Sequence, residues 1–257
     1  MDPELAEVAD VSEPATPERR DRPDKVAEKL ALCILRDIVA RALEPGAKLP
    51  PEAMMLKRYG VGRASLREAL RILEVYGLIW MKPGPGGGPV VADVSSVDFG
   101  RTATFFFHAA GATLHDLVEA RVYMEPLMAR LATERLTEES AAALQRSLDR
   151  EQATLDLPRG EWPFDSTRFH SVLDGMSGNR VMSLFGQSII DLYVERIRPV
   201  FGGQRRHLHE IHSDIGAAVL KGNAVQAERL MRIHVEDTAA RFSAQFPMSA
   251  SETIDWR

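Results

Sequence analysis

The sequence predicts a mainly α-helical chain, in which a small N-terminal domain of three helices and one β-hairpin precedes an all-helical C-terminal domain. Apolar residues recur at helical spacing over most of the chain, and two short apolar runs joined by a Pro- and Gly-rich turn occur in LIWMKPGPGGGPVVAD, residues 78–93. The chain has 257 residues, 45% of them hydrophobic and 27% charged. This length and composition are typical of a protein with two moderate cores.

Composition changes along the chain suggest the domain boundaries. Residues 1–22 are acidic, contain proline and show no sustained period, so we expect a disordered tail. We place the first domain at residues 23–93, a linker at 94–100, the helical domain at 101–245 and a C-terminal tail at 246–257.

The single cysteine and the lack of a long apolar segment indicate the cellular compartment in which the protein is expected. Cys33 lies among Leu30, Ile34 and Leu35, which predicts a buried thiol, and one cysteine cannot form a disulfide framework. The N-terminus has no apolar run suited to a signal peptide, and the most apolar segment, residues 102–114, is too short to span a bilayer. We therefore expect a cytoplasmic protein without a membrane partner.

Three helices are expected in the first domain. An apolar pattern from Lys25 fits a helix that ends before Glu44-Pro45-Gly46, and a second short helix fits residues 51–58, stopped by Tyr59-Gly60. The third helix begins after Gly62 and extends to about Tyr76. The order of elements is helix, turn, helix.

The third helix has one apolar face and one basic face. Arg63 and Arg67 are four residues apart and share a face, with Arg71 one turn further, while the apolar stripe consists of Leu66, Ala69, Leu70 and Leu73. Although the whole chain has a net charge of −5, residues 23–93 carry +3. The positive charge therefore concentrates where this helix lies, as in a DNA-recognition helix.

The hairpin that follows predicts a wing. In a winged helix-turn-helix the recognition helix enters the major groove while the hairpin tip approaches the backbone or the minor groove. Glycines permit a close approach, so we expect the tip, including Gly87, to contact DNA. A flexible loop is the alternative interpretation of these glycines.

The second half of the chain shows amphipathic helical patterns and almost no strand signal. Breaks are expected at Pro158 with Gly160, at Ser177-Gly178, at Pro199 with Gly202 and Gly203, and at Gly222-Asn223. The expected helices cover residues 113–136, 138–157, 163–176, 179–198, 207–220 and 224–242.

The string EPGAKLPPEAMMLKRYGVGRASLREALRILEVYGLI resembles the GntR family of bacterial transcription regulators over residues 25–92. The helical half resembles the FCD-type effector domain of the FadR-like branch, in EARVYMEPLMARLA, FHSVLDGMSGN and HSDIGAAVLKGNAVQAERLMRIH. This resemblance implies a winged helix-turn-helix domain joined to an all-helical domain that binds an effector and dimerises.

The resemblance further implies that Arg63 and Arg67 contact DNA, with Ser65 nearby. Arginine can grip guanine or a phosphate through two N–H donors. Arg71 lies further from the helix start than the residues that usually touch bases. The alternative role of all three arginines is a solvated helix face with an internal ion pair. Where the family often has another DNA-contacting arginine, this chain has Ala53, which predicts fewer polar contacts or a variant operator.

Three histidines indicate a metal site in the helical half. His212 and His234 lie ten residues before and eleven residues after Gly222-Asn223, so an antiparallel helix pair would bring them side by side. The resemblance implies that they ligate a divalent cation, such as zinc or nickel, together with His170. Each histidine could instead be a hydrogen-bonded interior residue.

The fourth ligand of the family is an aspartate four residues before the first histidine, where this chain has Ser166. Asp165 is one residue away, about 140° around an ideal helix from His170, and would need an irregular first turn to bind the metal. It could also act as a first-turn acid.

Arg121 occupies a position that, in the resemblance, faces the effector pocket, where it could bind an anion. The alternative is a surface ion pair with Glu119 or Glu125. His207 and His209 could join the metal site or lie at a solvated helix start.

We therefore expect a ligand-responsive repressor rather than an enzyme, which binds double-stranded DNA at a palindromic operator as a homodimer and a small carboxylate effector near a divalent metal. One alternative is the same regulator with a metal-free acyl-CoA effector. The alternative of another class is a metal-dependent hydrolase, for which no general base is evident beside the histidines.

Overall fold

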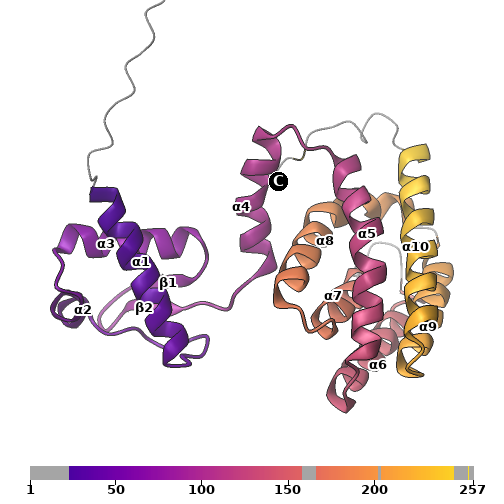
Figure 1. The fold of residues 1–257 in the computed structure, drawn as a ribbon, viewed down its shortest axis with the longest axis horizontal. Helices are drawn as coiled ribbons and strands as arrows, with labels where there is room; N and C mark the ends of the chain where they lie inside the picture. Colours follow the sequence, from indigo (N-terminus) through magenta and orange to yellow (C-terminus); the bar gives the residue numbers. More distant parts are fainter. Residues whose placement is uncertain (1–22, 158–165, 202–203, 246–253, 255–257) are drawn as a thin grey trace, which may run out of the picture. The chain divides into compact units, whose positions relative to one another are not determined.

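The computed structural model describes residues 23–157, 166–201, 204–245 and Ile254. The chain divides into two compact units, residues 1–93 and 94–257. Helices dominate both units, and the one sheet among the described residues is the two-stranded hairpin of the first unit (Figure 1). The predicted fold class, mainly α with an N-terminal winged helix-turn-helix, is confirmed.

The first unit contains three helices followed by the hairpin. The helices are α1 (Pro23–Ala40), α2 (Glu52–Tyr59) and α3 (Arg63–Val75), and the strands are β1 (Ile79–Lys82) and β2 (Gly88–Val91). The strands are antiparallel, with Ile79 opposite Val91 and Lys82 opposite Gly88. Lys48 extends this sheet by an isolated bridge to Val90.

The turn between α2 and α3 depends on Gly60. Its φ of 64° is in the left-handed region, and its N–H donates to the carbonyl of Leu56, which ends α2. Two residues later Gly62, in an extended conformation, precedes the first residue of α3. The chain therefore passes from α2 to α3 in three residues, 60–62.

The apolar stripe of α3 is buried as predicted. Leu66, Ala69, Leu70 and Leu73 pack with buried residues of α1 and with Ile79 and Val91 of the hairpin. Tyr59 also connects α2 to α1, because its hydroxyl donates to Asp37 Oδ2 at 2.6 Å. Burial together with this carboxylate raises the pKa of Tyr59 to about 12.

The prediction of a buried Cys33 is wrong, because this residue is exposed. The buried face of α1 is formed by Ala27, Leu30, Ala31, Ile34 and Ile38. Cys33 directly precedes Ile34, about 100° around the helix, and therefore falls outside that face. Apolar neighbours in the sequence did not indicate which side of the helix the thiol occupies.

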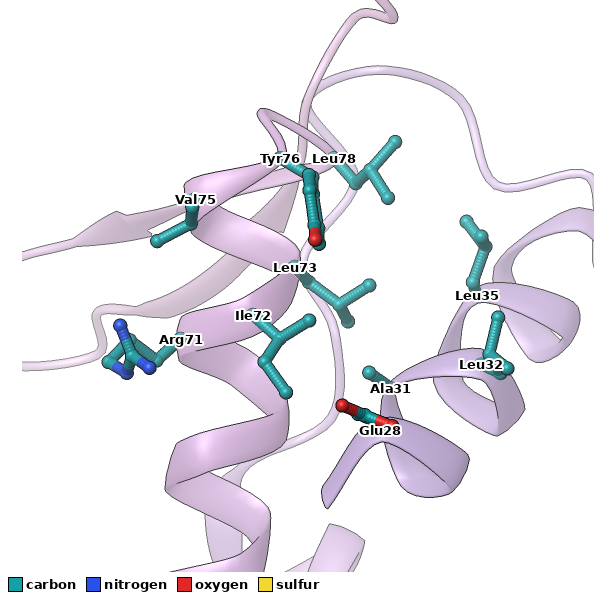
Figure 2. A pocket seen from close by; sticks show the side chains of 10 residues that line it. All are labelled: Glu28, Ala31, Leu32, Leu35, Arg71, Ile72, Leu73, Val75, Tyr76 and Leu78. Carbon is teal, nitrogen blue, oxygen red and sulfur yellow. The ribbon is translucent and has the colours of Figure 1, made fainter. Parts of the chain in front are cut away.

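A groove of about 350 Å³ lies between α1 and the C-terminal half of α3. Figure 2 shows Leu32 and Leu35 of α1 facing Ile72 and Tyr76 across it. Leu32 is 54% exposed and Tyr76 52% exposed. Of the three arginines of α3, only Arg71 is among the residues that line the groove.

The second unit contains seven helices among the described residues. They are α4 (Ser96–Ala109), α5 (Leu114–Glu134), α6 (Glu138–Ala153), α7 (Ser166–Met176), α8 (Arg180–Phe201), α9 (Arg205–Leu220) and α10 (Ala224–Gln245). No helix in the part of the chain that the structure describes is long and apolar enough to cross a membrane.

The expected helices omit α4 altogether, and several helix boundaries differ from the expectation, including the start of α4 and the end of α8. The expected linker, residues 94–100, is helical from Ser96, because the hydroxyl of Ser95 accepts from the N–H of Val97 and caps α4. Ser96 then donates to Asp191 Oδ2 of α8 at 2.8 Å, which joins α4 to the bundle. At the other boundary, α8 continues past Pro199 to Phe201.

Helix α5 is central to the second unit. It packs along α10 and also contacts α7, α8 and α9 (Figure 1). Its start is fixed by a capping box in which Thr113 and Asp116 bond each other's backbone N–H groups. Side chains of α5 thereby reach the same interior as those of α7, α9 and α10, where the three histidines lie.

Candidate DNA-binding face and metal centre

The basic face of α3 is open to solvent. Arg63 and Arg67 are exposed, and Ser65 is half-buried between them. The side chain of Arg67 is 70% exposed, and its Nε lies 3.4 Å from Glu52 Oε1 of α2. Such an exposed pair is weak, so both guanidinium groups are available at the N-terminal end of the helix.

Arg71 differs from these two arginines, because it is held by Glu68. Its Nε donates to Oε2 at 3.0 Å and its Nη2 donates to Oε1 at 2.6 Å. These hydrogen bonds lower the pKa of Glu68. Arg71 therefore forms the ion pair on the helix face that the alternative interpretation expects, with Glu68 as its partner.

The tip of the hairpin requires glycine at position 87. A Cβ atom there would lie 2.2 Å from the carbonyl oxygen of Lys82 and 2.8 Å from that of Gly84. The N–H of Gly87 donates to the Gly84 carbonyl at 2.9 Å, which closes the turn. The glycine is thus needed for the shape of the tip, whether or not it contacts DNA.

Sequence reasoning missed Lys48. Its Nζ donates to the carbonyl of Gly86 at 3.2 Å, so an ammonium group lies beside the hairpin tip. The pairing of residues 47–49 with β2 brings this lysine there, through hydrogen bonds such as that from Leu49 N to the Pro89 carbonyl at 2.9 Å. Only the tertiary pairing reveals this neighbour.

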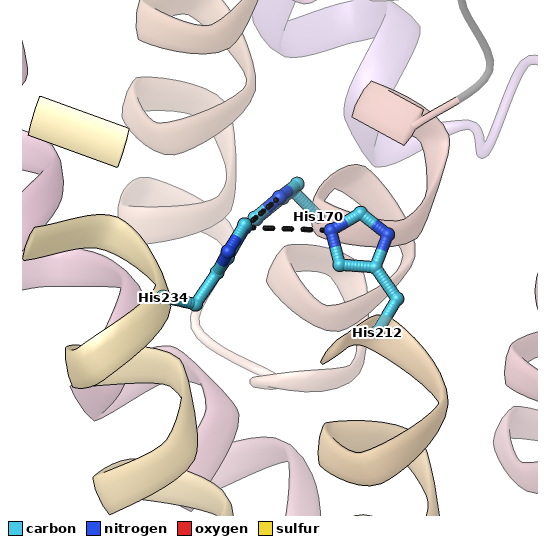
Figure 3. A group of neighbouring side chains, drawn as sticks. All are labelled: His170, His212 and His234. Carbon is cyan, nitrogen blue, oxygen red and sulfur yellow. Dashed lines mark hydrogen bonds between the residues drawn. The ribbon is translucent and has the colours of Figure 1, made fainter. Parts of the chain in front are cut away.

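The three predicted histidines converge in the second unit. His170 of α7, His212 of α9 and His234 of α10 are all buried and can offer one nitrogen each within 4.8 Å of one another (Figure 3). Nε2 of His234 is 3.3 Å from Nε2 of His170 and 3.4 Å from Nε2 of His212. The prediction that these residues meet is correct.

Two buried glutamates orient two of the rings. Nδ1 of His170 is 2.7 Å from Oε2 of Glu125, and Nδ1 of His212 is 3.0 Å from both carboxylate oxygens of Glu151. Burial alone would raise the pKa of both glutamates, but the interactions with Arg121 and His170 at Glu125, and with His212 and His209 at Glu151, outweigh burial and lower these pKa values. Glu151 therefore accepts the Nδ1–H of His212. Nδ1 of His170 and Oε2 of Glu125 are within ion-pair distance, but neither atom makes a hydrogen bond among the described residues.

The contact with Glu151 fixes which nitrogen of His212 faces the other histidines. With the proton at Nδ1, the neutral ring of His212 presents an unprotonated Nε2 toward His234. Burial, strengthened by the neighbouring imidazoles, lowers the pKa of His234 well below its ordinary value. Burial also lowers the pKa of His212. Neutral imidazoles that converge in this way are ligands suited to a cation.

The spacing also fits a metal. Nitrogens bound tetrahedrally at about 2.0–2.1 Å from a zinc ion lie about 3.3–3.4 Å from each other. The two Nε2 distances from His234 agree with this value. The triad could therefore hold a divalent ion, with further coordination positions for other ligands.

Three further residues that were considered for the metal or effector site are Asp165, Ser166 and Arg121. Asp165 lies outside the described residues, and Ser166 is the first residue of α7. Arg121 is 6% exposed and donates from Nε to Glu125 Oε1. The alternative for Arg121, a surface ion pair with Glu119 or Glu125, named the correct partner, Glu125, but this pair is buried.

The sequence did not predict that Glu125 lies beside His170, or that Glu151 belongs to this site. His209 extends this network weakly, because its Nδ1 is 3.4 Å from Glu151 Oε2, whereas His207 is exposed and lies 3.7 Å from Glu210. The i to i+4 spacing of Arg121 and Glu125 was a usable signal. Glu151 carried none, because 61 residues separate it from His212.

A recognition helix with a wing, joined to a helical unit, is the arrangement of a DNA-binding transcription regulator. Comparisons agree: the model of the bacterial regulatory proteins, gntR family, matches residues 26–87, and the FCD domain matches residues 116–237. The chain belongs to the GntR family of transcription regulators, and it is not an enzyme.

Individual relatives support this assignment. The chain is 30% identical to the uncharacterized HTH-type transcriptional regulator Rv0494 of Mycobacterium tuberculosis, over 84% of this chain and 89% of that protein. It is 26% identical to the HTH-type transcriptional repressor NanR of Klebsiella aerogenes, over 77% and 78%. A solved structure of Streptococcus agalactiae GntR superposes with a TM-score of 0.63 at 25% identity, over 83% of this chain and 99% of that one.

Proposed function

We propose that this GntR-family regulator is a repressor that binds a palindromic operator as a homodimer and responds to a small carboxylate effector at a divalent metal ion. The observation that carries the proposal is the convergence of three buried Nε2 atoms, from His170, His212 and His234, two of whose rings lie against buried carboxylates. Repression is supported by the relatives named NanR, which are repressors.

The DNA-binding part of the proposal assigns contacts to Arg63, Ser65 and Arg67 at the N-terminal end of α3. This end of a recognition helix enters the major groove, and the exposed guanidinium groups suit guanine or phosphate. Arg71 and the hairpin tip at Gly87 are assigned to the flanks, where Lys48 adds a positive charge. A homodimer would present two such faces to two half-sites.

The effector part of the proposal assigns the metal to the three histidines, with Asp165 as the fourth ligand. When bound, the ion would supply positive charge and open coordination positions for a carboxylate. Arg121 is buried beside Glu125, one contact away from His170. It would add positive charge behind the site while Glu125 keeps the His170 ring in place.

The test is the metal content of the purified full-length protein. We expect about one zinc or nickel ion per chain, lost in His212→Ala and retained in the control His115→Ala, because His115 is exposed on α5. Removal of the ion with a chelator should lower the melting temperature of the parent protein. A parent protein without metal, whose melting temperature does not respond to added zinc, would contradict the metal-assisted site and favour a metal-free effector.

A second measurement tests the DNA-binding part. We expect the full-length protein to bind a fragment from upstream of its own gene, and Arg63→Ala combined with Arg67→Ala to weaken that binding at the same salt concentration. Equal binding by the parent and the double variant would contradict the assignment of α3. Light scattering of the free protein and of its DNA complex measures the expected dimer.

A further inference from the structure

Asp174 is a buried acid that no part of the proposed site yet uses. It lies on α7 four residues after His170, so the two side chains share a helix face. It is 1% exposed. Its Oδ2 has no hydrogen-bond partner among the residues that the structure describes.

The surroundings of this carboxyl group are apolar on one side and charged on the other. A Cβ atom at Gly186 of α8 would lie 2.6 Å from Asp174 Oδ2 and 2.8 Å from the methyl group of Met128. The glycine therefore leaves the space that the carboxyl group occupies. On the charged side, Glu125 and Arg121 of α5 are close enough to act on Asp174 electrostatically.

Those two charged residues do not satisfy Asp174. Arg121 donates to Glu125, and Glu125 contacts His170, so their charges are already paired. Burial raises the pKa of Asp174 well above its ordinary value, and Glu125 acts in the same direction. The group is a neutral or unpaired acid inside the helical domain.

An acid in this state lowers the stability of the fold. A buried polar group without a partner loses its hydration and gains nothing in return, and an apolar side chain of similar size would pack without that penalty. A bound ligand that supplies the missing hydrogen bond would explain why an acid occupies position 174. The flexible thioether of Met128, which lies against the same glycine, can move aside for such a partner.

We propose that Asp174 is a specificity-determining residue of the effector site, which accepts a hydrogen bond from a hydroxyl or ammonium group of the effector. This inference rests on the proposed function, because the carboxylate of the same effector would lie at His170, His212 and His234. Hydroxyl and ammonium groups can both donate a hydrogen bond to the carboxyl group of Asp174, but only the ammonium group is charged.

The helix geometry sets the length of the effector. Four residues of α7 separate His170 from Asp174, which corresponds to a rise of about 6 Å. A carboxylate at the histidines and a donor at Asp174 are therefore joined by a chain of about four carbon atoms. Shorter acids would reach only one end of the site.

The experiment uses full-length, zinc-loaded protein and three acids that differ at one end: butyrate, 4-hydroxybutyrate and 4-aminobutyrate. Calorimetry measures the affinity of each acid for the parent protein and for Asp174→Leu. The matched control is Asp191→Leu, because Asp191 is a half-buried acid of α8 that accepts a hydrogen bond from Ser96.

We expect the parent protein to bind at least one donor-bearing acid roughly tenfold or more tightly than butyrate. Asp174→Leu should bind all three acids about equally, while Asp191→Leu keeps the preference of the parent. A preference for 4-hydroxybutyrate identifies a hydroxyl as the donor, and a preference for 4-aminobutyrate identifies an ammonium group. Without ligand, Asp174→Leu should melt at a higher temperature than the parent, and Asp191→Leu at a lower one.

Several results would overturn the assignment. They are equal binding of the three acids by the parent, no binding of any of them, a preference that survives in Asp174→Leu, or a lower melting temperature for that variant. The last result would mean that the carboxyl group has a structural partner, such as a buried water. Zinc content is measured separately, so a protein that binds zinc without the preference contradicts only this inference, and one that shows the preference without zinc contradicts only the metal site.

Discussion

Nδ1 of His170 lies 2.7 Å from Oε2 of Glu125, and both side chains are almost completely buried. This contact joins α7 to α5 and directs the opposite nitrogen of the ring toward His234. Glu151 does the same for His212 from α6. The geometry of the three histidines therefore depends on two glutamates that would not themselves touch a metal ion.

Replacing these glutamates should weaken metal binding while the histidines remain. We expect Glu125→Gln and Glu151→Gln each to lower zinc affinity by roughly 10–100-fold, because a neutral amide holds and polarises the imidazole ring less strongly than a carboxylate does. Competition with a coloured chelator measures the affinity. The control is Glu134→Gln, since Glu134 is an exposed residue that pairs with Arg130, and an equal loss in this control would contradict the prediction.

The three arginines of α3 should contribute unequally to DNA binding. Arg63→Ala and Arg67→Ala are each expected to cost about 1–3 kcal/mol, the range for an arginine that contacts a base through two N–H groups. Arg71→Ala should cost less, because Glu68 already holds that guanidinium. Fluorescence anisotropy with a fragment from upstream of the gene checks this order at fixed salt, with Arg130→Ala as the control. A larger loss for Arg71→Ala than for Arg63→Ala would contradict it.

Gly87→Ala should distort the hairpin tip. The added Cβ would lie 2.2 Å from a backbone oxygen, so the tip must move, at an expected cost of roughly 1–3 kcal/mol in unfolding free energy. Hydrogen exchange over residues 78–92 should become faster, and DNA binding should weaken. Gly62→Ala is the matched control for stability, because nothing lies within 4 Å of its added Cβ. Unchanged exchange in Gly87→Ala would mean that the tip has more space than this contact allows.

The metal-free protein should lose stability as the pH falls below about 6.5. Burial lowers the pKa of His234 in the folded chain, so below the ordinary value of 6.5 the unfolded chain binds a proton that the folded chain does not. Stability therefore decreases with falling pH, by up to about 1.4 kcal/mol per pH unit for each such histidine. Urea unfolding between pH 7 and pH 5 should show a smaller decrease for His234→Gln than for the parent. Asp174 has a raised pKa and acts with the opposite sign, but it is present in both proteins and does not affect their difference. Parallel curves would contradict the prediction.

Much of the fold could be predicted because its signals are local. Turn and cap residues marked most helix ends, and the apolar stripe of α3 followed directly from its spacing. Where a local signal was ambiguous, the prediction failed. Cys33 has apolar neighbours in the sequence and yet lies outside the buried face of α1, and the segment before Phe99 has no strong helical pattern although Ser95 caps a helix there.

The sequence by itself determined the two-domain order, the recognition helix with Arg63 and Arg67, and the histidines that could share a site, because periodicity and short spacings report on neighbours within one or two helices. Tertiary structure alone decided which groups surround those histidines. Glu151 reaches His212 across 61 residues, and Asp174 meets Gly186 of another helix without gaining a partner. Such contacts depend on how helices pack, since hydrogen bonding and burial act between side chains that are close in space and often distant in the chain.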